Sequence, residues 1–370
     1  MDERKILDKS IDIGSKTSKN RFCIQPMESG DATLEGLPSK YTMERYHRYA
    51  SGGAGIVVIE AVTLQYRSRS TEHQLLLDPE NAQNMNFWRR FFRTMKDCYP
   101  DTLFVMQLQH AGEFSSDVFS ERVCVKPHPA FGGKIINADY ADNVIDRTIA
   151  AARFLYDAGC DGVDIKFCHG YLGSQILRPY NDREWKYGGS WANRSSFAFN
   201  MCEGIRRHIP DRGFLVGAKV SAFEDFDGGQ TFEESLDLIR GLEARGADFF
   251  IESLGNAYFS WPLMAPGGKD RGNVYKHLAA AKIIKDSLAP GTVLIGGGLS
   301  ALGSKLPVVS EYGIYNGLFD MAGLGRQAFA DPNLPNKYTE DRLEEVHWCR
   351  CCDKCGELLR SGRQSYCVFI

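Results

Sequence analysis

Eight short runs rich in β-branched and aromatic residues alternate with longer amphipathic segments along this chain of 370 residues, and this alternation most constrains its fold. The runs span residues 21–27, 55–61, 102–108, 162–166, 215–221, 248–253, 293–298 and 317–325. Apolar residues recur with a helical period in segments 41–51, 84–98, 143–158, 193–208, 231–245, 274–287 and 302–310, and again from residue 334 onward. Eight strand–helix units in one chain of this length predict a closed (β/α)8 barrel, the TIM barrel.

An open, doubly wound sheet is the rival architecture for alternating strands and helices. It would place a G-x-G-x-x-G turn directly after the first strand. This chain instead carries Gly296, Gly297 and Gly298 in its seventh unit, so the barrel is favoured. The chain after about residue 335 reads as an addition to the barrel. We therefore expect a barrel domain at 1–335 and a Cys-rich C-terminal extension at 336–370.

Composition excludes several classes of protein. With 43% hydrophobic residues the chain can bury a large core. A net charge of −3 and the lack of a Lys/Arg run argue against a nucleic-acid binder. No apolar run approaches the roughly 20 residues that span a bilayer, and the polar start of the chain does not resemble a secretory leader. We therefore expect a cytoplasmic protein with no nucleic-acid or membrane partner.

Four cysteines near the end of the chain have the spacing of a metal-binding motif. Cys349, Cys352, Cys355 and Cys367 read C-x2-C-x2-C-x11-C. Thiolates at such spacing can converge on one ion or one cluster. In a reducing compartment, clustered cysteines indicate metal more often than disulfides. Spacing alone leaves a Zn²⁺ site and an iron–sulfur cluster equally open.

Chemistry in a barrel belongs at the carboxyl ends of the strands. In the fourth unit, strand alternation directs Asp164 and Lys166 toward the barrel interior. A buried ion pair would give these two charges a purely structural role. However, His169 and Tyr171 follow within five residues, and a lysine at the catalytic rim followed by these side chains favours an active site.

The loops after the last two strands form a second candidate site. Gly297 and Gly298 follow the seventh run, and Gly325 and Arg326 lie at the end of the eighth. The glycines could serve only to make tight turns. Bare backbone amides beside a guanidinium group instead suggest a phosphate site, which barrels commonly build from these two loops.

Several motifs occur in the order found in the old yellow enzyme family of flavin oxidoreductases, which the chain resembles along nearly its whole length. They are Asn20-Arg21-Phe22 through Pro26-Met27, Glu60-Ala61, Gln107-Leu108 through His110-Ala111-Gly112, His169-Gly170-Tyr171-Leu172, Asn181 through Arg183, Tyr187-Gly188-Gly189-Ser190 through Asn193-Arg194, and Gly325-Arg326 through Ala330-Asp331-Pro332. The cysteine tail makes the resemblance closest to the iron–sulfur branch, which includes trimethylamine dehydrogenase, 2,4-dienoyl-CoA reductase and bile-acid enoate reductases. The resemblance thus implies FMN, and it favours a [4Fe-4S] cluster over zinc at the four cysteines.

The same resemblance implies roles for individual residues. The flavin contacts would come from Pro26, Met27 and Ala61 at the ring, Gln107 at the pyrimidine edge, Lys219 as a cation that stabilises the reduced flavin, and Gly297, Gly298, Gly325 and Arg326 at the phosphate. Tyr171 would protonate the substrate carbon, and His169 would bind the substrate together with Lys166.

Three residues depart from the family pattern. Lys166 stands where relatives have His or Tyr, so a point charge with three donors replaces a directed side chain. It could stabilise enolate-like charge or pair with a substrate carboxylate. Glu28 follows Met27, and Glu113 stands where many relatives have Arg. Both carboxylates could equally be solvated loop residues.

These implications predict an enzyme that reduces an activated C=C bond of an enone or enoate by hydride from flavin N5 and a proton from Tyr171. The cluster would relay electrons. An amine-type dehydrogenase that passes electrons out through the cluster is the alternative reaction. A non-catalytic electron-transfer or binding subunit with a zinc-stapled tail is the alternative of another class.

The electron source follows from a further difference. Members of the iron–sulfur branch usually continue into nucleotide-binding domains, whereas three residues follow Cys367 here. We therefore expect electrons from a separate ferredoxin or flavoprotein, or from NAD(P)H that docks directly on the flavin. We also expect a small-molecule substrate and a homo-oligomer.

Overall fold

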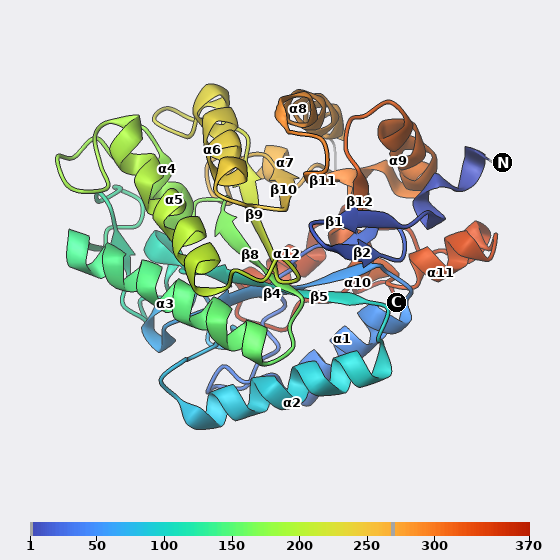
Figure 1. Ribbon diagram of the computed structural model, residues 1–370, viewed down its shortest axis with the longest axis horizontal. Coiled ribbons are helices and arrows are strands. Elements are labelled where there is room, and N and C mark those ends of the chain that lie inside the picture. The colour runs from blue at the N-terminus through green and yellow to red at the C-terminus, as the bar shows by residue number, and fades with distance from the viewer. Residues whose placement is uncertain (1–2, 268–270) are drawn as a thin grey trace.

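Eight parallel strands close into a barrel in the computed structural model, which describes residues 3–267 and 271–370 (Figure 1). In chain order the strands are β3 (Phe22–Ile24), β4 (Ile56–Thr63), β5 (Leu103–Gln109), β8 (Gly162–Phe167), β9 (Leu215–Ser221), β10 (Phe249–Ser253), β11 (Val293–Gly296) and β12 (Met321–Leu324). Strand β12 pairs with β3 and thereby closes the ring. Each strand overlaps one predicted run, so the (β/α)8 prediction is confirmed and the open sheet is excluded.

Helices form the outer layer around the strands (Figure 1). The main ones are α1 (Lys40–Ser51), α2 (Ala82–Cys98), α3 (Ala138–Asp157), α5 (Trp191–His208), α6 (Phe232–Ala244), α8 (Asn273–Ser287), α9 (Leu306–Tyr315) and α11 (Leu334–Thr339). Helix α1 begins at a capping box in which the Ser39 side chain accepts from the Thr42 amide and the Thr42 hydroxyl accepts from the Ser39 amide. Asn81, Asn137, Ser190 and Thr231 cap α2, α3, α5 and α6 through side-chain oxygens that accept from an amide in the first turn.

The predicted helix at 302–310 is correct only in its second half. The segment begins as the 3₁₀ turn η4 (Leu299–Lys305), and α9 follows it. Gly303 interrupts η4 before α9 begins, because its φ of +57° and ψ of −132° cannot belong to a right-handed helix. Other short elements carried no clear signal in the sequence. They are the strand pair β6 (Val123–Cys124) and β7 (Lys134–Ile135), and the helices α4 (Leu172–Leu177), α7 (Trp261–Met264), α10 (Arg326–Ala330) and α12 (Lys354–Arg360).

An unpredicted hairpin closes the N-terminal end of the barrel. It consists of β1 (Ile11–Ile13) and β2 (Lys16–Ser18). Ile13 is fully buried against apolar side chains of the barrel interior, among them Leu215 and Phe249 near the starts of their strands. Gly14 has a left-handed φ of +56°, and a Cβ there would lie 3.1 Å from the Asp248 carboxylate. The hairpin therefore closes this end of the barrel as far as the described residues extend.

The C-terminal extension crosses the opposite mouth of the barrel. The amide of Cys349 donates to the Gln327 side chain at 2.9 Å, and the amide of Ser365 donates to the Ser29 carbonyl at 2.7 Å. Ser29 lies after β3 and Gln327 after β12, so the tail is fastened to neighbouring strand ends. In the described part of the chain, no helix is both long and apolar enough to cross a membrane.

Candidate active site

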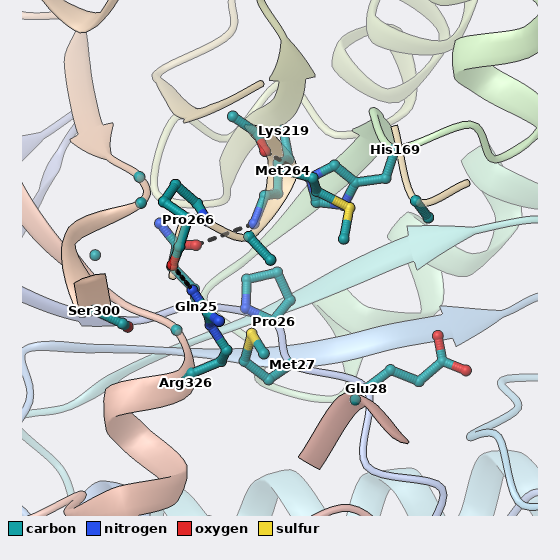
Figure 2. Close-up of a pocket in the computed structure, with 18 of the residues that line it drawn as sticks. Gln25, Pro26, Met27, Glu28, His169, Lys219, Met264, Pro266, Ser300 and Arg326 are labelled. Carbon is teal, nitrogen blue, oxygen red and sulfur yellow. Dashed lines mark hydrogen bonds between the residues drawn. The ribbon is translucent and has the colours of Figure 1, made fainter. Parts of the chain in front are cut away.

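One cavity of about 190 Å³ lies at the carboxyl ends of the barrel strands (Figure 2). Ten of the predicted site residues line it: Pro26, Met27, Lys166, His169, Tyr171, Lys219, Gly297, Gly298, Gly325 and Arg326. They come from the ends of β3, β8, β9, β11 and β12, which the closed barrel brings together. The predicted convergence of strand four with the last two loops is therefore found in a single cavity.

Two predicted flavin contacts lie outside the cavity wall. Ala61 is buried, and its carbonyl accepts from the Gln74 side chain at 2.8 Å. Gln107 donates to a carboxylate oxygen of Asp164 at 2.6 Å. Burial raises the pKa of Asp164 to about 7, and its other carboxylate oxygen is buried with no protein partner. Gln107 thus belongs to a buried polar pair with Asp164, and its contact with a flavin stays a prediction.

Two buried lysines face the cavity without an ion-pair partner in residues 3–267 and 271–370. Lys219 donates to the Gln25 side chain at 3.1 Å (Figure 2). Lys166 is 8% exposed, and its ammonium nitrogen lies 3.3 Å from the centre of the Tyr171 ring. Burial lowers the pKa of Lys166. Buried cations without a carboxylate are costly, and a negatively charged ligand in this cavity would offset that cost.

Tyr171 holds its proton firmly. Its hydroxyl donates to a carboxylate oxygen of Glu28 at 3.3 Å, and the Ser70 hydroxyl donates to the other oxygen at 2.5 Å. Burial and the Glu28 charge raise the pKa of Tyr171 well above its ordinary value. Glu28, one of the two acidic residues that depart from the family pattern, therefore lines the cavity and contacts the predicted proton donor.

Glu113, the other acidic residue that departs from the family pattern, lies elsewhere. It is buried outside the cavity, and it accepts from the Arg178 guanidinium at 3.0 Å. Arg178 also pairs with Glu224 at 2.7 Å. Glu113 is thus part of a buried ion-pair network that supports the barrel mouth, and it neither contacts solvent freely nor faces the cavity.

His169 is held in an unusual backbone conformation. Its φ is +64°, in the left-handed region that non-glycine residues rarely adopt. Its Nε2 atom lies 2.5 Å from the Ser253 hydroxyl. Burial, together with Lys219 and Lys166, lowers the pKa of His169 well below its ordinary value. The imidazole is therefore neutral at pH 7 and can donate through one nitrogen.

The glycine loops form the other end of the cavity. A Cβ on Gly297 would lie 2.4 Å from the Glu252 carbonyl, and Gly298 has a φ of +68°. Only glycine fits these positions without displacing its neighbours. The Gly297 amide, however, donates to the Glu252 carboxylate at 2.8 Å, so Gly298, Gly325 and Arg326 remain as the candidates for an anion.

The four predicted metal-binding cysteines line a second, smaller cavity beside the first. Its wall contains Cys349, Cys352, Cys355 and Cys367, with Cys351, Arg326 and Phe329 among their neighbours. Cys355 lines both cavities. Nevertheless, no group of three or more His, Cys, Asp or Glu side chains in the described ranges is arranged to hold a metal ion. The thiolates share one wall, and the cluster stays a prediction.

The sequence carries the decisive family signal. Residues 7–345 match the NADH:flavin oxidoreductase / NADH oxidase family. The chain belongs to this family. The resemblance to old yellow enzymes is thereby confirmed, and with it the expectation of an FMN oxidoreductase at the level of the family.

Two curated relatives within this flavin oxidoreductase family are longer than the present chain. An NADH oxidase of Thermoanaerobacter brockii is 27% identical over 354 residues, which cover 92% of this chain and 52% of the relative. A cinnamate reductase of Clostridium sporogenes is 25% identical over 378 residues, which cover 95% of this chain and 55% of the relative. The chain thus spans about half the length of both curated relatives.

A solved structure supports the fold of this family member. A 2-naphthoyl-CoA reductase in complex with 2-naphthoyl-CoA superposes with a TM-score of 0.83 at 21% identity. The superposition covers 95% of this chain and 55% of that chain. At this identity the likeness concerns the barrel and its tail, and carries no statement about substrate.

The cavity of this flavin oxidoreductase also has wall residues that the sequence did not indicate. They are Glu252, His277 and Ser300 near the glycine loops, Trp261, Met264 and Pro266 around α7, and Asp353, Gly356, Leu359 and Ser365 from the tail. The α7 and tail residues belong to segments without strand-end motifs. Glu252 points from β10 toward a helix, where strand alternation gives no reason to expect a cavity.

Proposed function

We propose that this protein is an FMN-dependent oxidoreductase that reduces the activated C=C bond of an enone or enoate. The observation that carries the proposal is the single cavity in which Tyr171, His169 and Lys166 face the same space as Lys219 and the glycine loops. One end of this space suits a phosphate, and the other offers a proton donor beside a cation. The donor set therefore fits FMN and an electron-poor substrate.

Within that cavity, the chain's own residues divide the work of holding the cofactor. Gly298, Gly325 and Arg326 would bind the phosphate through amides and a guanidinium group. Pro26 and Met27 would contact the ring. The ammonium of Lys219 would stabilise negative charge on the reduced ring, which is how a protein tunes a flavin. Bound FMN would supply the hydride from its N5 position.

Three side chains would handle the substrate. The phenol of Tyr171 would donate its proton to the substrate carbon, and its high pKa keeps that proton in place until then. The Lys166 ammonium over the ring would stabilise the phenolate that remains. Neutral His169 would donate one hydrogen bond to the activating carbonyl or carboxylate, where negative charge develops.

We also propose that Cys349, Cys352, Cys355 and Cys367 hold a [4Fe-4S] cluster. Support comes from their all-thiolate donor set and from the one cavity that they share. Cys355 also belongs to the wall of the flavin cavity, which would keep a cluster close enough for electron transfer. A ferredoxin, a flavoprotein or NAD(P)H would supply the electrons.

An amine-type dehydrogenase is the second candidate, and one observation favours it. The Glu28 carboxylate lines the cavity and accepts the hydrogen bond of Tyr171. A substrate ammonium group could replace that donor and pair with Glu28. In this reaction Tyr171 would no longer need to protonate carbon.

Anaerobic purification followed by a screen of enoates, enones and amines distinguishes these functions. We expect the protein to retain FMN, and an enoate or enone to reoxidise the reduced flavin. Reduction of the oxidised flavin by an amine, without reoxidation by any alkene, would establish the second candidate. A protein that retains no flavin, and zinc in place of iron, would indicate a binding subunit.

A further inference from the structure

A buried Glu–His pair lies directly behind the glycine loop. Glu252 belongs to β10 and His277 to α8, and their side chains are 0% and 1% exposed. The Nδ1 atom of His277 lies 2.9 Å and 3.2 Å from the two carboxylate oxygens of Glu252. Both residues line the flavin cavity, and neither was indicated by the family motifs.

The neighbours of the pair determine how many protons it holds. The Nε2 atom of His277 lies 2.9 Å from the Leu263 carbonyl, which can only accept, so Nε2 carries a proton. A second proton must lie between Nδ1 and the Glu252 carboxylate, because two lone pairs would otherwise face each other. Whether it resides on nitrogen or on oxygen, the pair as a unit has no net charge.

The pair also shapes the loop. Glu252 accepts the Gly297 amide at 2.8 Å. A Cβ on Gly298 would lie 2.7 Å from the imidazole ring of His277, which therefore packs directly under the loop. Glu252 thus anchors Gly297, while His277 cancels the charge of Glu252 and supports Gly298.

We propose that His277 is a positioning residue for the FMN phosphate, because it neutralises Glu252 and so allows a carboxylate to anchor the phosphate loop without repelling the phosphate. The proposal rests on the phosphate site described under the proposed function. Loss of His277 alone would leave a buried, uncompensated carboxylate next to a dianionic group, which is the costly way to break such a pair.

The test compares FMN with riboflavin, which lacks the phosphate. Flavin-free protein is prepared from the full chain of the wild type and of His277→Gln, Glu252→Gln and the double variant, and both flavins are titrated by fluorescence. In His277→Gln we expect FMN affinity to fall by about 10-fold or more, and riboflavin affinity to change by less than about twofold. Glu252→Gln and the double variant should keep most of the FMN affinity, since the glutamine amide oxygen can still accept from the Gly297 amide and neither variant contains the lone carboxylate.

The double variant separates charge from packing. If it bound FMN as weakly as His277→Gln does, the effect would come from the lost imidazole ring, and the proposal would be overturned. An equal loss of FMN and riboflavin in His277→Gln would overturn it as well. If His277→Gln does not fold, Glu252→Gln still decides, because a phosphate-specific loss in that variant contradicts the proposed neutralisation.

The wild type itself tests whether the cavity contains a phosphate site. A wild-type protein that bound riboflavin as tightly as FMN would overturn the phosphate site, and the positioning role with it. A wild type that prefers FMN, with variants that do not alter this preference, would overturn only the role of His277.

Discussion

The barrel mouth and the cysteine tail are adjacent, yet their side chains are positioned by different means. In the barrel, backbone pairing fixes each direction, and Lys166 lies in register with Lys219 across β8 and β9. In the tail, a few hydrogen bonds fasten the chain to the strand ends, and Cys352 is exposed. The barrel site is thus built by the polypeptide itself, whereas the cysteine site would be completed by the metal that it binds.

The largest expected effect concerns the tail. Cys352→Ser should lose the iron, because it removes one of four ligands. Cys351→Ser should keep it, since Cys351 is the surplus thiol of the segment and donates to the Ser300 carbonyl at 3.4 Å. Iron and sulfide assays measure both. Equal loss in both variants, or zinc in the wild type, would contradict the cluster, and loss of FMN together with iron would show that the two regions are not independent.

The second prediction concerns the proton donor in the barrel. Tyr171→Phe should slow reoxidation of the flavin by an alkene by about 10² or more, while flavin reduction and substrate binding stay nearly intact. Stopped-flow measurement of the two half-reactions gives the comparison. Reoxidation at the wild-type rate would exclude Tyr171 as the proton donor and favour the amine reaction.

The third prediction concerns the stability of the barrel at low pH and whether this stability depends on metal in the tail. The Nδ1 atom of His110 accepts from the Gly112 amide at 3.0 Å, and burial lowers the pKa of His110 to about 3. The unfolded chain binds this proton below about pH 6.5, whereas the folded chain does not until about pH 3, so stability falls as pH decreases across this window. The loss at pH 5 should be about 2 kcal/mol.

Urea unfolding at several pH values measures how the free energy of unfolding depends on pH, with His110→Asn as the variant that cannot titrate. We expect the difference in this pH dependence between variant and wild type to be the same in iron-loaded and iron-free protein. A slope that depends on iron would mean that the stability of the barrel is coupled to the tail.

A fourth prediction concerns Lys166, the lysine expected to bind the substrate. Lys166→Ala removes a buried charge that has no carboxylate partner among the described residues, so substrate binding and flavin reoxidation should both weaken by about 10-fold. Lys166→Arg serves as the control that keeps the charge. A loss confined to uncharged substrates would argue against recognition of a negative group.

The smallest expected effect is on the flavin itself. Lys219→Met removes a cation from the cavity wall, so the flavin potential should fall by about 30 mV, even where FMN is retained. Potentiometry on the two proteins measures the shift. An unchanged or raised potential would mean that Lys219 does not stabilise the reduced ring.

The sequence predicted well what backbone periodicity determines. The alternation of side chains along the fourth strand predicted that Lys166 points into the barrel. The order of the strands predicted that it lies at the same mouth as Arg326, and both residues line one cavity. The hairpin around Ile13 could not be predicted, because its plugging role depends on a barrel that closes far along the chain. The contact between the Gly297 amide and Glu252 could not be predicted either, because no local pattern encodes it.

The wall that the two cavities share has a consequence for the order of assembly. Asp353, Cys355, Gly356, Leu359 and Ser365 close one side of the flavin cavity, and Arg360 fastens α12 by lying 4.6 Å from the centre of the Trp261 ring on α7. Before this segment docks, the barrel mouth is open on that side. When docked, it covers that side of the cavity. We therefore expect the cysteine tail to slow both the entry and the release of a flavin without preventing either.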